Sequence, residues 1–227
     1  ETMMLASVSG SAAGSAAISG VVNTLVAKND VRAQVKEGAL LKAGLTAQGA
    51  AELGGGAQAT QGEILVSAED ETEAINFAGG LAAGSSAGVG ATVVVLVYDK
   101  TVEASIGGQG STRATGNITV SADALDDLYL TAIAFGASGN VGVAGGVNVL
   151  VFTNHVLAYA GGSIQAGGNV RIAATAESLL VNLAAAVSGA GNVAVTGVAV
   201  VTYFYNETKA YAAAGAVIEA LGSITIA

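Results

Sequence analysis

One serine and one histidine are the first residues in this chain whose types suggest chemistry. The segment Gly84-Ser85-Ser86-Ala87-Gly88 matches the Gly-x-Ser-x-Gly pattern of a hydrolase nucleophile. That pattern works only at a strand-to-helix turn with a histidine base in reach. No helix-forming sequence follows Ser86, and the single histidine, His155, falls in a polar stretch typical of a turn. We therefore attribute the motif to the Gly/Ser/Ala-rich composition and expect His155 to be a solvated turn residue.

Carboxylates are the better organised group, and the excess of seventeen acidic over eight basic residues gives a net charge of −9. Glu1, Glu71 and Asp126 occupy one position of a repeat described below, thirteen residues before a recurring glycine. Other carboxylates lie beside this position: Asp70, Glu177, Glu69, Glu73, Asp123 and Asp127. Stacked repeats would place this acidic column along one edge. We interpret it as a solvating edge, with weak divalent-cation binding and a catalytic carboxylate pair as alternatives.

Other motifs that carry chemistry are weak or missing. The three arginines, Arg32, Arg113 and Arg171, occupy different repeat positions, which argues against a lyase or hydrolase groove. Gly88-Val89-Gly90 lacks the third glycine and the helix of a dinucleotide site. Eight basic residues form no stripe for nucleic acid, and without cysteine there are neither disulfides nor thiolate metal sites. We assign no catalytic, cofactor-binding or metal-binding residue, and we expect no enzyme activity.

A tandem repeat organises the whole chain. Its four units are 1–68, 69–122, 123–174 and 175–227, which we expect to form one repeat domain, a fragment of a larger protein. Two glycine columns set the register, followed by a polar break: Gly14, Gly84, Gly139 and Gly191, then Gly20, Gly90, Gly145 and Gly197, then Asn29, Asp99, Asn154 and Asn206. The units close on similar segments at 63–68, 117–122, 169–174 and 223–227. The first unit has an extra piece within Leu45–Gln61, which we interpret as a loop.

Alternation with a period of two predicts β-strands. In unit three, Leu128, Leu130, Ala132, Ala134 and Gly136 alternate with bulkier residues, and both faces are largely apolar. Such a strand is expected to be covered on both sides. Turn signals at 138–140, 153–155 and 167–168 predict about four strands a unit.

The two glycine columns carry separate expectations. The first lies in or beside turns, where glycine can take a positive φ. The second lies inside strands, where glycine indicates that a side chain has no room. Gly145→Val is therefore expected to cost about 1–3 kcal/mol by overpacking, and more than a similar change at Gly107 or Gly162.

Four runs without charge span 2–27, 74–98, 128–154 and 178–206. A hydropathy window would mark each of them as a membrane helix. Glycine columns and turn dipeptides interrupt all four, and no Lys/Arg cluster flanks one side. We therefore expect no transmembrane segment.

The segment from Gly162 to Ala174, GSIQAGGNVRIAA, resembles the repeats of filamentous haemagglutinin-type exoproteins, and Asn117–Ala122 and Leu221–Ala227 echo it. The whole Ala/Gly/Val-rich unit resembles repeats of large bacterial surface proteins, the leukotoxin-family filamentous adhesins. This resemblance implies a secreted, elongated, β-helical stalk that displays or forms an adhesive surface, without catalytic residues. The unit is longer than a short haemagglutinin repeat, so it could be two coils or one wide coil.

These observations predict an all-β solenoid, a parallel β-helix of four tandem repeats. The expected function is a structural stalk or adhesive repeat segment of a secreted bacterial cell-surface exoprotein. Its partners would be neighbouring repeats of the same chain and a host cell surface or carbohydrate. The alternative is a carbohydrate- or host-receptor-binding module with its site on the insertion in unit one. The aromatic cluster Tyr203-Phe204-Tyr205 favours the binder, but Tyr203 and Tyr205 facing a core would explain it equally well.

Overall fold

The computed structural model describes residues 1–44 and 60–227, and within these residues the chain forms strands and turns without a helix. Two long strands and one short strand recur in order. The strands are β1 (Thr2–Ala13), β2 (Ala16–Val35), β3 (Leu40–Ala43), β4 (Ile64–Gly84), β5 (Ala87–Ile106), β6 (Ser111–Ala114), β7 (Ile118–Ser138), β8 (Val141–Ala160), β9 (Ser163–Ala166), β10 (Val170–Ala190), β11 (Val193–Ala212), β12 (Val217–Ala220) and β13 (Ile224–Ile226).

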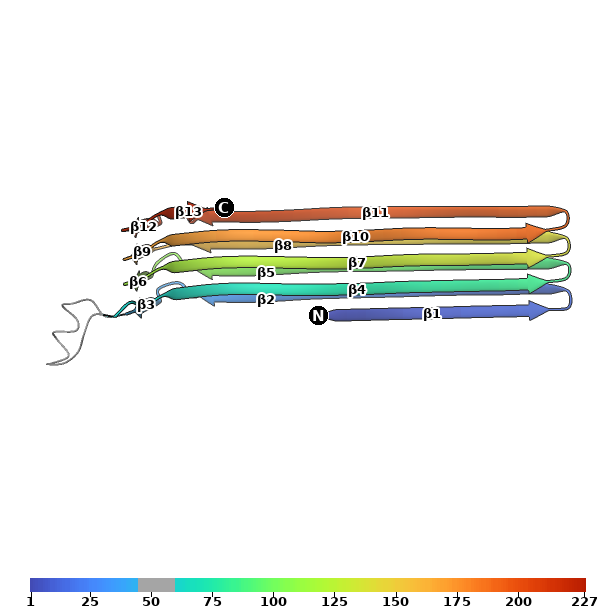
Figure 1. The fold of residues 1–227 in the computed structure, drawn as a ribbon, viewed down its shortest axis with the longest axis horizontal. Coiled ribbons are helices and arrows are strands. Elements are labelled where there is room, and N and C mark those ends of the chain that lie inside the picture. The colour runs from blue at the N-terminus through green and yellow to red at the C-terminus, as the bar shows by residue number, and fades with distance from the viewer. Residues whose placement is uncertain (45–59) are drawn as a thin grey trace.

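The strands form three parallel sheets, and each sheet takes one strand from every coil (Figure 1). Sheet A has the order β1-β4-β7-β10-β13, sheet B has β11-β8-β5-β2, and sheet C has β12-β9-β6-β3. The chain runs along sheet A, turns back along sheet B, crosses sheet C and begins the next coil. The fold is therefore the predicted parallel β-solenoid, and each repeat is one wide coil of three strands instead of four.

Each coil is long and flat. A strand of 20 or 21 residues extends for about 65–70 Å at 3.3 Å per residue. Two-residue turns at 14–15, 85–86, 139–140 and 191–192 join sheet A to sheet B, and we call this side the narrow end. Sheet C lies at the opposite side, the wide end, as Figure 1 shows.

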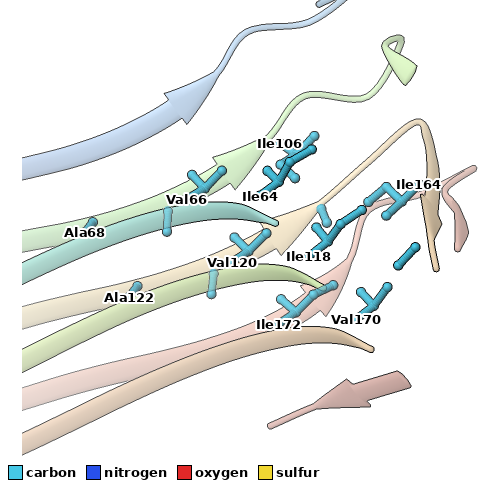
Figure 2. Packing of buried hydrophobic residues seen from close by; sticks show 14 of the residues in the cluster. Ile64, Val66, Ala68, Ile106, Ile118, Val120, Ala122, Ile164, Val170 and Ile172 are labelled. Atoms are coloured by element: carbon cyan, nitrogen blue, oxygen red, sulfur yellow. The ribbon is translucent and has the colours of Figure 1, made fainter. Parts of the chain in front are cut away.

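The core is graded from large to small side chains along the coil. At the wide end it contains Ile64, Val66, Ile106, Ile118, Ile164 and Ile172 (Figure 2). Leucines and aromatic rings follow in the middle, and then Ala132, Ala134 and Gly136 toward the narrow end. The alternation predicted for 128–136 is confirmed, because these residues point inward. The side chains shrink because sheets A and B converge.

At the narrow end the two sheets approach backbone to backbone. A Cβ added at Gly90 would lie 2.2 Å from the carbonyl oxygen of Phe135, and one at Gly136 would lie 2.1 Å from that of Val143. Both glycines face the interior between sheets A and B. No side chain fits there, so the glycine content of the repeat is in part a packing requirement.

The predicted register is wrong by one residue in the second unit. Gly20 pairs with Ala91, which pairs with Gly145, so Gly90 lies one position away on the opposite face. In the first column, Ser85 replaces Gly84 beside Gly139. A slip of one residue moves every side chain of a strand to the other face. The closing segments are aligned as predicted, because Ile64, Ile118, Val170 and Ile224 are in register.

Two expectations for the glycine columns are therefore wrong: the second column was expected to have no room for a side chain, and the first was expected to adopt positive φ. Gly145 faces outward, and an added Cβ would meet only the carbonyl oxygen of Gly197 at an ordinary 3.7 Å. At Gly107 and Gly162 an added Cβ would lie 2.5 Å from backbone atoms. Positive φ occurs at Gly38, Gly44, Gly162 and Gly215, which flank the short strands of sheet C, and not in the first column.

Two further predictions are wrong, one about a turn and one about the cover of the strands. The supposed turn at 153–155 lies inside β8, which runs unbroken to Ala160. The strands are also covered on one side only, since outward residues such as Leu81 and Phe135 are exposed. Polar residues can occupy the strand interior here because they are paired across the coil. The extra piece in unit one falls almost wholly at 45–59, outside the described residues.

Candidate functional site

The most unusual group of polar residues is a buried ion-pair network in the middle of the coil. Lys100 on β5 is fully buried, and its Nζ lies 2.5 Å from Asp70 Oδ2 and 2.8 Å from Asp126 Oδ1. The two carboxylates come from neighbouring coils of sheet A, and the lysine comes from sheet B. One ammonium group therefore ties together two coils and two sheets.

The remaining polar groups around Lys100 complete this network. Asp126 Oδ2 accepts hydrogen bonds from Asn154 Nδ2 and Ser178 Oγ, both at 3.4 Å. Asn29 Nδ2 donates to Asp70 Oδ1 at 2.6 Å. Burial raises the pKa of Asp126 above its ordinary value, while the hydrogen bond and charge of Lys100 act in the opposite direction. Each of the three charged side chains, Lys100, Asp70 and Asp126, therefore has a partner of opposite charge within the network.

The predicted column of Glu1, Glu71 and Asp126 does not form, because its alignment contains the one-residue error in the second unit. Asp126 pairs with Thr72 and Ser178, whereas Glu71 pairs with Leu125 on the outward face. Glu1 precedes Thr2, which pairs with Glu73, so it falls beside Thr72. Of the three predicted residues, only Asp126 is part of the buried network. The structure therefore does not bring Glu1, Glu71 and Asp126 together as ligands.

A different acidic surface does form on the outward face of sheet A. Glu69 lies in register with Asp123, and Glu73 with Asp127, so like charges stand side by side on adjacent strands. A groove of about 570 Å³ runs over Glu69, Glu71, Asp123 and Glu177. Within residues 1–44 and 60–227, no three such side chains converge closely enough to hold a metal ion. The face is thus a row of mutually repelling, solvated carboxylates.

His155 lies in a strand and not in a turn, which corrects its expected place. It points outward from β8, in register with Thr101 and Glu207. Its Nδ1 lies 3.0 Å from Glu207 Oε2, and Glu207 also pairs with Lys209. Hydrogen bonds from Lys209 and then His155 lower the pKa of Glu207. Ser86 lies in a turn at the narrow end, far from His155 and with a strand after it.

Sheet C presents a second groove at the wide end. Lys42, Arg113, Gln165 and Glu219 are in register across its four strands and line the groove. Gln165 Nε2 donates a hydrogen bond to Glu219 Oε2 at 2.9 Å. Gly44, which directly precedes the insertion, also borders this groove. The predicted ligand site on the insertion itself lies outside the described residues.

Stacked aromatic rings run through the interior from coil to coil. The ring centroids of Tyr98 and Phe152 are 5.8 Å apart, and those of Phe152 and Phe204 are 5.3 Å apart. The central residue of the aromatic cluster therefore faces the core. Tyr203 and Tyr205 point outward, so of the two explanations that the sequence left open, the one in which they face a core is wrong.

The fold defines a class, a flattened parallel β-solenoid with one coil per repeat. No protein-family model, curated protein or solved structure matches the chain. Since the described residues contain no helix, none of them forms a helix able to cross a membrane.

Proposed function

We propose that this chain is a structural repeat segment, a stalk or adhesive rod of a secreted bacterial cell-surface exoprotein. The observation that carries the proposal is the stacking itself. Each coil repeats the same three strands in register with the next, and the interior columns continue from coil to coil. Such an array gains length without changing its cross-section.

Inner and outer coils differ in how much of the interior column is covered by stacking. Tyr98 and Phe152 are 1% and 0% exposed, whereas Phe204, in the same interior column, is 46% exposed. Val198 and Val200, which lie on β11, are also about half exposed. A further coil stacked on β11 would cover these residues as the inner coils are covered. The resemblance to filamentous adhesins supports the cell-surface location.

Duplication of one coil tests the structural role. Ile118 pairs with Val170, so a second copy of 118–169 inserted after Asn169 should add one coil. Small-angle scattering should then show a particle about 4.8 Å longer along the stack, with an unchanged cross-section and an all-strand circular dichroism spectrum. Unfolding of the variant, or growth in another dimension, would contradict the proposal.

Adhesion is tested separately, with beads carrying the chain applied to host cells and to a carbohydrate array. Binding that survives deletion of 45–59 would assign adhesion to the coils. Binding lost with that segment would favour the alternative, a carbohydrate- or host-receptor-binding module. His155→Ala should leave the bead binding unchanged, since the His155 side chain is paired with Glu207 and lies against the ring of Tyr205.

A further inference from the structure

The four charge-free runs of the sequence come together in space. Each run consists of the end of a sheet A strand, the turn at the narrow end and the start of a sheet B strand. The register of both sheets aligns the runs from coil to coil. As a result, the half of the solenoid next to the narrow end carries no charged residue in its interior, on its two outward faces or in its turns. We call this part the charge-free half.

The outward faces of the charge-free half are apolar. On sheet B, valines and an isoleucine line up across the coils, as in the rows Ile18-Val89-Val143-Val195 and Val22-Val93-Val147-Ala199. On sheet A the corresponding rows include Met4-Ile75-Tyr129-Val181 and Gly10-Leu81-Phe135-Val187. Each face measures about 36 by 19 Å, or about 700 Å², from the strand rise and spacing. Exposed apolar patches beyond about 300–600 Å² mark interaction or membrane surfaces.

The boundary of this half lies at the same level on both sheets. The last charged residues are Glu73 and Asp127 on sheet A, and Lys28 and Asp99 on sheet B. The contact between Lys100 and Asp126 shows that these positions face each other across the coil. Tyr129, Tyr203 and Tyr205 point outward near this boundary, where tyrosine is favoured at a membrane–water interface.

The dimensions and the turns distinguish lipid from a second copy of the chain. Residues 74–84 and 87–98 extend for about 36–40 Å, enough to cross the roughly 30 Å hydrocarbon core of a bilayer. The turns at the narrow end contain Gly, Ser and Asn and no charge: Gly14-Ser15, Ser85-Ser86, Gly139-Asn140 and Gly191-Asn192. A second copy of the chain packed on one sheet would leave the apolar face of the other sheet in water. A bilayer covers both faces at once, and strands of this length place the uncharged turns at its far interface.

We propose that the charge-free half is immersed in a lipid bilayer, with the stacking axis of the coils in the membrane plane. The inner coils meet the main backbone requirement of such a setting, because their strands pair on both sides, whereas the outer strands β1, β2, β10 and β11 need a neighbouring coil to pair their open edges. The two opposite apolar faces then contact acyl chains, and the acidic and ion-paired half remains in water. This inference goes beyond the proposed stalk function, since a rod that does not bind lipid could still be a stalk. It departs from the expectation of no transmembrane segment, which was argued against membrane helices and not against stacked strands.

The chain lacks tryptophan, so a single introduced tryptophan can report depth. Leu183 and Thr175 both point outward from β10, one in the charge-free half and one in the charged half. With phosphatidylcholine vesicles, the emission of Leu183→Trp should shift to shorter wavelength and be quenched by lipid brominated in the acyl chain. For the matched Thr175→Trp variant, the emission wavelength should stay unchanged and brominated lipid should not quench the emission.

A lysine at the same two positions gives a second measurement. Leu183→Lys should lower vesicle partitioning in a flotation assay by about 100-fold, while Thr175→Lys should leave it unchanged, with both variants showing the wild-type circular dichroism spectrum. The proposal is overturned if the wild-type chain does not float with vesicles. It is also overturned if Leu183→Trp is shielded in vesicle-free oligomers and does not respond to lipid, because the faces then bind a second copy of the chain.

Discussion

Replacement of Lys100 by methionine tests the buried network most directly. Methionine keeps an unbranched apolar side chain, one atom shorter, and removes the one ammonium group shared by Asp70 and Asp126. Two carboxylates would then be buried without a cation, and breaking a buried pair in this way costs about 3–5 kcal/mol. We expect Lys100→Met to lower the free energy of unfolding by this amount at pH 7.5.

The cost should depend on pH, and its sign follows from linkage. Burial already raises the pKa of Asp126 in the folded state, and loss of Lys100 removes the group that opposes this shift. The folded variant therefore binds more protons than the unfolded chain as pH rises above the ordinary aspartate pKa. Stability is retained below that value and is lost as pH rises through the raised pKa. The difference from wild type should consequently be smaller at pH 4.5 than at pH 7.5.

Urea unfolding followed by circular dichroism at the two pH values measures this effect. Lys28→Met is the matched control, because Lys28 pairs with Asp99 at 3.3 Å on the exposed face, where an ion pair contributes about 0–1 kcal/mol. Neutralising both partners in Lys100→Met/Asp70→Asn/Asp126→Asn should restore much of the stability. A cost below about 1 kcal/mol for Lys100→Met, or an equal cost at both pH values, would refute the assigned network.

Three further predictions concern packing and surface charge. Gly90→Val should cost at least about 1–3 kcal/mol in urea unfolding, because its Cβ would meet the backbone, whereas the outward Gly145→Val should stay within about 0.5 kcal/mol. Equal effects would show that the register is wrong. Asp123→Asn should raise stability by about 0.2–1 kcal/mol by removing the repulsion with Glu69, and the melting temperature should rise no more in calcium than in sodium chloride of equal ionic strength. A melting temperature that rises selectively with calcium would indicate a cation site. Phe152→Ala should cost about 3–5 kcal/mol, since its ring lies fully buried between two others; a loss under 1 kcal/mol would show that the stack contributes little.

Local patterns in the sequence were sufficient for the fold class and for much of one coil. The alternation over 128–136 predicted which side chains point inward, and Gly139-Asn140 and Gly167-Gly168 predicted two of its turns. These features depend on near neighbours only, since side chains alternate along any strand and turn residues act within a few positions. The similar closing segments also gave the correct register where each sheet A strand begins.

The second unit shows where sequence patterns become insufficient. Gly84 and Gly90 match the spacing of the glycine columns, yet Ser85 and Ala91 occupy those positions in the stack. Glycine can be favoured in a turn, between two converging sheets or on an open face, and the sequence does not distinguish these causes. One misplaced residue then aligned Asp99, and not Lys100, with Asn29 and Asn154.

The sequence by itself determined that this protein is a repeated, all-β chain with charge confined to certain segments. Only the tertiary structure decided which distant residues meet, because contacts between coils join positions 52 or 54 residues apart. Lys100 meets Asp126 through the stacking of β5 against β7, and no local pattern links the two. In the same way, four uncharged runs that look like separate apolar segments become one surface, because parallel stacking aligns each run with the next.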